Sequence, residues 1–211
     1  MIDKILSNLD WLGHDCFRLR AAGQIVYFDP FQLSGDLPPA DLILVSHTHY
    51  DHFSPDDIKK IRRESTLIIT VPEAAAKLSG NVKTMQPGQS VTSGPFTIEA
   101  VRAYNTNKKF HPQANNWLGF IVTVEGVRIY HAGDTDHIPE MANYQADIAL
   151  LPVSGTYVMT ADEAAQAALE INPKVAVPMH FGSIVGEQSD AERFAAKLVN
   201  KIKVHIPGKS N

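Results

Sequence analysis

Residues 41–55 read Asp-Leu-Ile-Leu-Val-Ser-His-Thr-His-Tyr-Asp-His-Phe-Ser-Pro, and this stretch decides the fold. The apolar run from Leu42 to Val45 predicts a short buried strand. Ser54 and Pro55 predict the start of a helix, because serine is a favoured N-cap and proline suits the first helical position. The residues between them therefore lie on a loop at the carboxyl end of a strand, where α/β proteins place their ligands.

This loop is dense in side chains that bind metals. His47, His49, Asp51 and His52 fall within six residues, so they cannot all point away from one another. Neutral imidazole and carboxylate are ligands for zinc and similar divalent ions. The spacing therefore predicts a metal site, with a polar loop that happens to be rich in histidine as the alternative.

Two later segments repeat the order of strand, polar residue and turn. Asp134 follows the strand-like run of residues 127–130, and His180 follows the apolar run of residues 174–179. Because strand ends on one edge of a sheet converge on one cleft, we expect Asp134 and His180 to join the loop of residues 47–52.

The remaining pattern indicates an α/β protein with mixed sheets, folded as a single domain over residues 1–211. Helices are predicted at 55–63 and 72–78, and two more open with capping boxes at 160–163 and 189–192, ending near 170 and 201. Further strands are predicted at residues 9–20, 24–29, 41–46, 67–71, 82–85, 89–93, 96–104, 117–124, 127–131, 147–153 and 204–206.

Composition limits the class of protein. The chain has 211 residues, 44% of them hydrophobic, and a net charge of −4 with histidine neutral, so the basic stripe typical of nucleic-acid binding is not expected. Cys16 is the single cysteine, which suits a reducing cytosol. No apolar run is long enough to span a membrane, and no signal-peptide pattern is visible. We expect a cytoplasmic enzyme with a small-molecule substrate, no membrane insertion and an oligomeric state that the sequence leaves open.

The motifs resemble the metallo-β-lactamase superfamily over residues 12–180. Its His-x-His-x-Asp-His signature matches residues 47–52, and its later aspartate and last histidine match Asp134 and His180. Its early aspartate, which closes the second strand, matches Asp29. The segments at 12–14, 131–135 and 178–182 look like a subgroup of small metal-dependent hydrolases near the ascorbate-phosphate lactonase and N-acyl-phosphatidylethanolamine phospholipase D branches.

The resemblance implies a four-layer αββα sandwich with two divalent ions, Zn²⁺ or alternatively Mn²⁺, at one edge between the sheets. One ion is assigned to His47 and His49, and the other to Asp51, His52 and His180. Asp134 is assigned to both ions, and Asp51 and Asp134 are the expected catalytic residues.

This site implies hydrolysis of a small ester, lactone or phosphoester by a metal-activated hydroxide. The alternatives are a phosphodiesterase or nuclease of the same fold, and a non-catalytic metal-binding protein. Asp29 is expected behind the ligands, bonded to a ligand histidine or to the signature loop.

One position departs from the family pattern. Many members carry a histidine where the strand at 97–104 ends, and this chain has Asn105 there, with His111 as the nearest histidine. An amide oxygen is neutral and a weak ligand for zinc. We favour His111 as the remaining ligand of the first ion, although it could instead line the pocket and leave that ion short of one protein ligand. On the same loop, Lys108 and Lys109 could meet an anionic substrate, but a solvated pair is the simpler interpretation.

Overall fold

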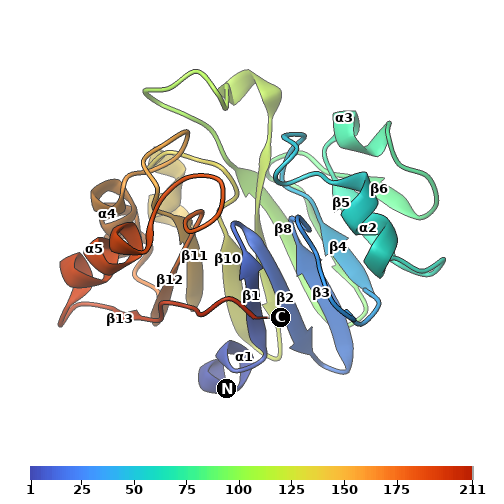
Figure 1. Cartoon of the computed structure of the whole chain (residues 1–211), viewed down its shortest axis with the longest axis horizontal. Helices are drawn as coiled ribbons and strands as arrows, with labels where there is room; N and C mark the ends of the chain where they lie inside the picture. Colours follow the sequence, from blue (N-terminus) through green and yellow to red (C-terminus); the bar gives the residue numbers. More distant parts are fainter. Residues whose placement is uncertain (211) are drawn as a thin grey trace.

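The strands of the computed structural model, which describes residues 1–210, form two mixed sheets (Figure 1). The first sheet has the strand order β1-β2-β3-β4-β5-β6. Its strands are β1 Leu9–Gly13, β2 Cys16–Ala21, β3 Gln24–Phe28, β4 Leu42–Leu44, β5 Leu67–Thr70 and β6 Val82–Thr84. The second sheet has the order β13-β12-β11-β10-β9-β8-β7. Its strands are β7 Ser90–Ser93, β8 Phe96–Arg102, β9 Leu118–Val124, β10 Val127–His131, β11 Ile148–Pro152, β12 Val175–Met179 and β13 Lys203–Val204.

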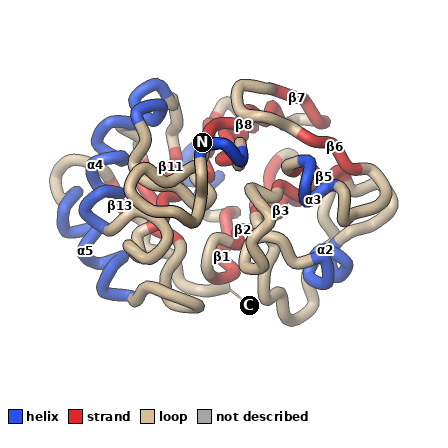
Figure 2. The backbone as a smooth tube through the Cα atoms, turned by 90° about the horizontal axis from the view of Figure 1, so that it is seen from above, coloured by secondary structure: helices blue, strands red, loops and turns tan. Residues whose placement is uncertain are grey.

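Helices cover the outer faces of both sheets, which confirms the predicted αββα layering. Figure 2 shows α4 and α5 on one side of the strands and α2 and α3 on the other. The α-helices are α1 Ile2–Leu6, α2 Pro55–Ile61, α3 Pro72–Ala75, α4 Ala161–Ile171 and α5 Gln188–Leu198, and the 3₁₀ helices are η1 Gln113–Asn115 and η2 Pro139–Asn143. Among residues 1–210, no helix has the length and apolar character needed to cross a membrane.

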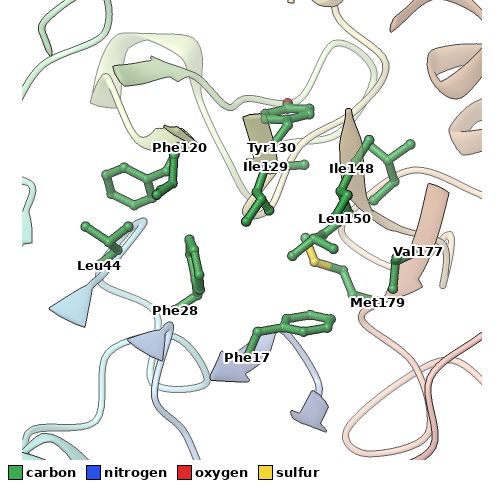
Figure 3. Packing of buried hydrophobic residues seen from close by; sticks show 14 of the residues in the cluster. Phe17, Phe28, Leu44, Phe120, Ile129, Tyr130, Ile148, Leu150, Val177 and Met179 are labelled. Carbon is green, nitrogen blue, oxygen red and sulfur yellow. The ribbon is translucent and has the colours of Figure 1, made fainter. Parts of the chain in front are cut away.

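The main core lies between the two sheets. Phe17, Phe28 and Leu44 of the first sheet face Phe120 and Leu150 of the second (Figure 3), and each of these side chains is at most 1% exposed. All five residues of β11 and all five of β12 are buried, as expected for parallel strands covered on both faces. This packing gives the two sheets one fixed relative position.

The predicted ligands share an edge because of strand direction. β3 runs parallel to β4 in the first sheet, and β10, β11 and β12 run parallel in the second. The carboxyl ends of β3, β4, β10 and β12 therefore release Asp29, the signature loop, Asp134 and His180 at one edge. A backbone hydrogen bond of 3.1 Å from Leu118 N to Ser46 O joins the two sheets at this edge.

The structure corrects three sequence predictions. The single strand predicted at 9–20 is a hairpin, because His14 and Asp15 form the turn between β1 and β2, and His14 has a positive φ of 53°. Helix α1 was not predicted. The second capping box is Glu187 with Asp190, whose carboxylate accepts from Glu187 N at 2.8 Å, so α5 begins before the predicted Ser189.

A close approach of backbone gives a test of the packing at this edge. A Cβ on Gly119 in β9 would lie 2.9 Å from Ala132 O and 3.0 Å from His131 O, and these are backbone atoms, which move less easily than the end of a flexible side chain. We expect Gly119→Ala to lower the free energy of unfolding by about 1–3 kcal/mol, as for other overpacked sites. Urea denaturation measures this change. Gly208→Ala is the control, because nothing lies within 4 Å of its added Cβ; equal stability of the two variants would contradict the prediction.

Candidate metal centre

The signature loop is anchored by one buried carboxylate. Asp29 Oδ1 accepts a hydrogen bond from Ser46 N at 2.7 Å, and Oδ2 accepts from Ser46 Oγ at 2.7 Å and from His52 Nδ1 at 2.8 Å. The loop then turns through backbone bonds from His52 and Phe53 to His49 O. Asp29 therefore lies behind the signature loop, as the sequence predicts, and fixes its first and last parts together.

Four histidines of the cluster are held in the same tautomer. His52 Nδ1 donates to Asp29, and His47 Nδ1 lies 2.9 Å from Ser46 Oγ, whose own proton goes to Asp29. His180 Nδ1 lies 2.8 Å from Ser154 Oγ, which donates to a backbone carbonyl and so accepts from the ring. A ring that donates from Nδ1 keeps a lone pair on Nε2.

His111 is the fourth of these histidines, and Asn105 holds it. Asn105 Oδ1 accepts from His111 N at 2.9 Å and from His111 Nδ1 at 3.1 Å, and Asn105 Nδ2 donates to Tyr157 O at 2.8 Å. The structure thus brings His111, rather than Asn105, into the cluster. Asn105 orients the ring, which is a role that the sequence prediction did not consider.

The free Nε2 atoms converge on the two oxygens of Asp134. His111 Nε2 lies 3.0 Å from Oδ2, with His47 Nε2 at 3.9 Å from the same oxygen. His52 Nε2 and His180 Nε2 lie 3.2 Å and 3.3 Å from Oδ1. One carboxylate therefore stands between two groups of imidazoles, with one oxygen turned toward each group.

Two sets of possible ligands result. The first comprises His47, His49, His111 and Asp134, and His49 Nδ1 lies 3.0 Å from His47 Nε2 and 3.2 Å from His111 Nε2. The second lies around His52 and His180 and appears in two overlapping groups, one adding His14 and Asp51 and the other adding Asp15 and Asp134; in every group the ligand atoms lie within 4.8 Å of one another. All seven predicted ligands are thus brought together at one edge, and their binding of metal remains a prediction.

The structure adds two residues to the site. For His14 the sequence left a role in the pocket and a role outside it equally open, and Asp15 was not considered. His14 Nε2 lies 3.1 Å from Asp51 Oδ2, and Asp15 is fully buried beside His52. The signal was present, because Gly13 and His14 also follow a strand. The turn at His14 and Asp15 was not recognised because residues 9–20 were predicted as one continuous strand, in which Asp15 would be an interior residue.

Electrostatics in the cluster depend on burial and on Asp134. Burial lowers the pKa of His47 well below its usual value, and the neighbouring His52 lowers it further. At His52, burial opposes a positive charge, but the Asp134 carboxylate prevails and raises its pKa. Burial likewise opposes charge on Asp134, yet His52 and His180 hold its pKa well below the usual range. The cluster is therefore built around one carboxylate that stays negative.

Several buried polar atoms of the cluster are unsatisfied within the described chain. His52 Nε2, His180 Nε2, Asp134 Oδ1 and both oxygens of Asp15 have no partner in hydrogen-bonding geometry among residues 1–210. Each such group costs about 1–3 kcal/mol when left without a partner. Burial also raises the pKa of the Asp15 carboxyl well above its usual range. A cation bound between these atoms would remove most of this penalty.

A pocket opens over the cluster and has a volume of about 250 Å³. Its floor is formed by His49, Asp51, His111 and Asp134, and its walls by Tyr50, Phe110, Tyr157 and Ile184. A larger pocket of about 400 Å³ lies elsewhere, near α1, and none of the predicted ligands lines it. The pocket over the cluster is therefore the one in which a small molecule would meet the metal-binding side chains.

Three other residues that could titrate or react lie outside the cleft. His131 donates from Nε2 to Asp15 O at 2.8 Å and stacks on Phe28, so it is a core residue. Burial raises the pKa of the Cys16 thiol to about 12, which excludes a reactive thiolate at neutral pH. His137 pairs with Glu170 on the surface.

Comparison with known proteins identifies the family. The model of the β-lactamase superfamily domain matches residues 8–180. A UPF0173 metal-dependent hydrolase from Thermococcus kodakarensis is 34% identical over 219 residues, which cover 95% of this chain and 96% of the relative. A UPF0173 metal-dependent hydrolase from Archaeoglobus fulgidus is 33% identical over 227 residues, covering 96% of this chain and 97% of the relative.

Solved structures agree with the sequence relatives. A protein from Parabacteroides distasonis, provisionally named a metal-dependent hydrolase, has 35% identity and a TM-score of 0.86, covering 96% of this chain and 93% of that chain. A metallo hydrolase from Ignicoccus hospitalis has a TM-score of 0.80 at 23% identity, covering 96% of this chain and 95% of that chain, and it supports the fold alone. The chain belongs to the metallo-β-lactamase superfamily. Within it, the chain falls in the group of small metal-dependent hydrolases.

The contacts of His111 predict its contribution to metal binding. We expect His111→Ala to lower the affinity for Zn²⁺ at least ~tenfold, because the first set loses one of its imidazoles. Asn105→Ala should lower it by about 10–100-fold, since the ring loses the acceptor that fixes its tautomer. Competition with a fluorescent chelator measures both, with His137→Ala as the control. If His111→Ala keeps full metal content while Asn105→Ala does not, then Asn105 is the ligand and the assignment is wrong.

The burial of His14 predicts a pH dependence of the metal-free protein. Burial lowers the pKa of His14 from 6.5 to about 4. Between these two values the unfolded chain binds the proton and the folded chain does not, so stability falls as pH decreases below about 6.5. This group should contribute a loss of about 2 kcal/mol between pH 7.5 and pH 5.

Urea denaturation at the two pH values, compared with His14→Asn, isolates the contribution of His14. Asparagine is the suitable replacement because it tolerates the positive φ at this position and does not titrate. An equal loss of stability in the wild type and in His14→Asn would show that His14 does not carry the effect.

Proposed function

We propose that this protein is a hydrolase that uses two divalent ions, Zn²⁺ or alternatively Mn²⁺, to cleave a small ester, lactone or phosphoester. The observation that carries the proposal is the convergence of four Nε2 atoms, from His47, His52, His111 and His180, on the two oxygens of Asp134. Relatives named metal-dependent hydrolases support the same reaction class.

The donor set fits such ions. The side chains offer imidazole nitrogens and carboxylate oxygens, a combination that suits zinc and accepts manganese. His47, His49 and His111 would hold one ion, and Asp51, His52 and His180 the other, with Asp134 shared. Bound there, the two ions would make a water molecule more acidic and stabilise negative charge on the substrate.

The protein's own groups prepare this site in three ways. Hydrogen bonds from the rings to Asp29, Asn105 and Ser154 fix the ring orientations, so little reorganisation is needed at the moment of reaction. Burial of the cluster excludes bulk water and strengthens every charge interaction within it. Asp51 is held at Oδ2 by His14 and lines the pocket, so its carboxylate is oriented to bind an ion and to position a water molecule beside it.

A nuclease of the same fold is less well supported. The net charge is −4, and among the residues that line the pocket in the described chain there is no lysine or arginine to bind a phosphate backbone. We therefore propose a small molecule as the substrate. A purely structural, non-catalytic metal site is also less well supported, because the cluster forms the floor of an open pocket.

Metal loading and turnover test the proposal together. The protein would be stripped with a chelator and reloaded with Zn²⁺ or Mn²⁺, and ions per chain would be counted by elemental analysis. Activity would be measured on 4-nitrophenyl acetate, a γ-lactone and bis(4-nitrophenyl) phosphate. We expect two ions per chain and a loss of turnover of at least ~100-fold on removing them. The proposal would be refuted if the metal-free protein is as active as the reloaded protein, or if elemental analysis finds no bound ions after reloading.

A further inference from the structure

Exposed apolar side chains gather at the mouth of the pocket. Among residues 1–210, five large apolar side chains are exposed, and three of them line this pocket. These are Tyr50, Phe110 and Tyr157, with exposed fractions of 67%, 52% and 37%. Single exposed apolar residues are ordinary, but their concentration around one cavity marks a binding surface for an apolar group.

Each aromatic ring at the mouth of the pocket packs against another ring. The rings of Phe110 and Tyr157 meet edge to face, with centroids 4.6 Å apart and an interplanar angle of 76°. Tyr50 meets Phe31 in the same way at 5.9 Å. The loop that carries Phe110 is fixed by Asn105, which also bonds to Tyr157 O. The walls are therefore largely formed before a ligand arrives, which favours the binding of a flat group.

The walls of the pocket offer no positive side chain to a charged substituent of the substrate. Within the described chain the lining contains Asp51 and Asp134 but no lysine or arginine. The nearby Lys108 lies 2.6 Å from Asp136 Oδ1, so its charge is already neutralised. A negative group on the part of the substrate that contacts the walls, away from the ions proposed at Asp51 and Asp134, would meet no counter-charge there.

From these observations we infer that the substrate is a small uncharged ester or lactone whose carbonyl carries an aromatic or similarly flat apolar group. The inference rests on the proposed hydrolase function and narrows it to an ester or lactone that carries an uncharged, flat substituent. The flat group packs against Phe110 and Tyr157, and the carbonyl lies over Asp134 at the floor. In the reaction, the oxygen of water bonds to the carbonyl carbon, the carbon–oxygen bond to the leaving group breaks, and a proton passes to that oxygen, giving an acid and an alcohol.

Three methyl esters test the inference, because they share one leaving group. Methyl phenylacetate is uncharged and aromatic, methyl butyrate is uncharged and aliphatic, and monomethyl glutarate is anionic. We expect kcat/KM of the metal-loaded protein to be at least ~tenfold higher for methyl phenylacetate than for either of the others, since ring packing in such a pocket contributes on this scale. In Phe110→Ala the preference over methyl butyrate should fall to about twofold, mainly through KM. Val199→Ala, an exposed apolar residue outside the pocket lining, should keep the preference.

A binding measurement separates this inference from the proposed function. Phenylacetamide resists hydrolysis, and its contact with the loaded protein can be detected by saturation-transfer NMR, with butyramide as the comparison. Binding of phenylacetamide that Phe110→Ala abolishes supports the flat apolar site. If none of the esters is cleaved although phenylacetamide binds, the assignment of an ester as the substrate is overturned. Preference for monomethyl glutarate or methyl butyrate overturns the inference and leaves the hydrolase proposal standing. Absence of both binding and turnover overturns both.

Discussion

The site depends on the buried carboxylate of Asp29. It joins the end of β3 to both ends of the signature loop, through Ser46 and His52, and Ser46 O in turn accepts from Leu118 at the start of β9. One anion thus links the first sheet to the loop, and the loop to the second sheet. Because Asp29 accepts three hydrogen bonds, its own burial is compensated, and the same bonds determine which nitrogen of His47 and His52 faces the cleft.

The buried cluster lowers the stability of the fold. Imidazoles and carboxylates are buried at high density, with several polar atoms lacking partners among residues 1–210. Burial acts against a charge on His52 and His180, but the Asp134 carboxylate raises the pKa of both, so in the absence of a cation these imidazoles bind protons more readily. The continuous core between the sheets, which includes Phe17, Phe28 and Phe120, supplies the stability that tolerates this arrangement.

Sequence patterns predicted the parts of the protein that follow from strand direction. Asp29, Asp134 and His180 were placed correctly at one edge because each follows an apolar run, and parallel strands end together. The turn at His14 and Asp15 was missed because polar residues inside an apolar stretch read equally well as a continuous strand. The role of Asn105 was beyond sequence reasoning, since its partners His111 and Tyr157 are brought to it only by the tertiary fold. The pocket walls could not be predicted for the same reason, because their residues come from four separate loops.

Most of the proposed ligands follow strand ends, whereas the pocket walls lie on loops. This difference affects how the protein can change its substrate during evolution. Six of the seven proposed ligands follow the ends of β4, β10 and β12, and the seventh, His111, shares a loop with Phe110. Tyr157 and Ile184 lie on loops that carry none of the proposed ligands. Duplicated genes can therefore acquire new substrates by replacing the loops of Tyr157 and Ile184 while inheriting the same chemistry. Asn105 limits such replacement, because its side-chain amide bonds both to His111 of the cluster and to the backbone of Tyr157 in the pocket wall. A lineage that changes this residue has to re-evolve reactivity and selectivity together.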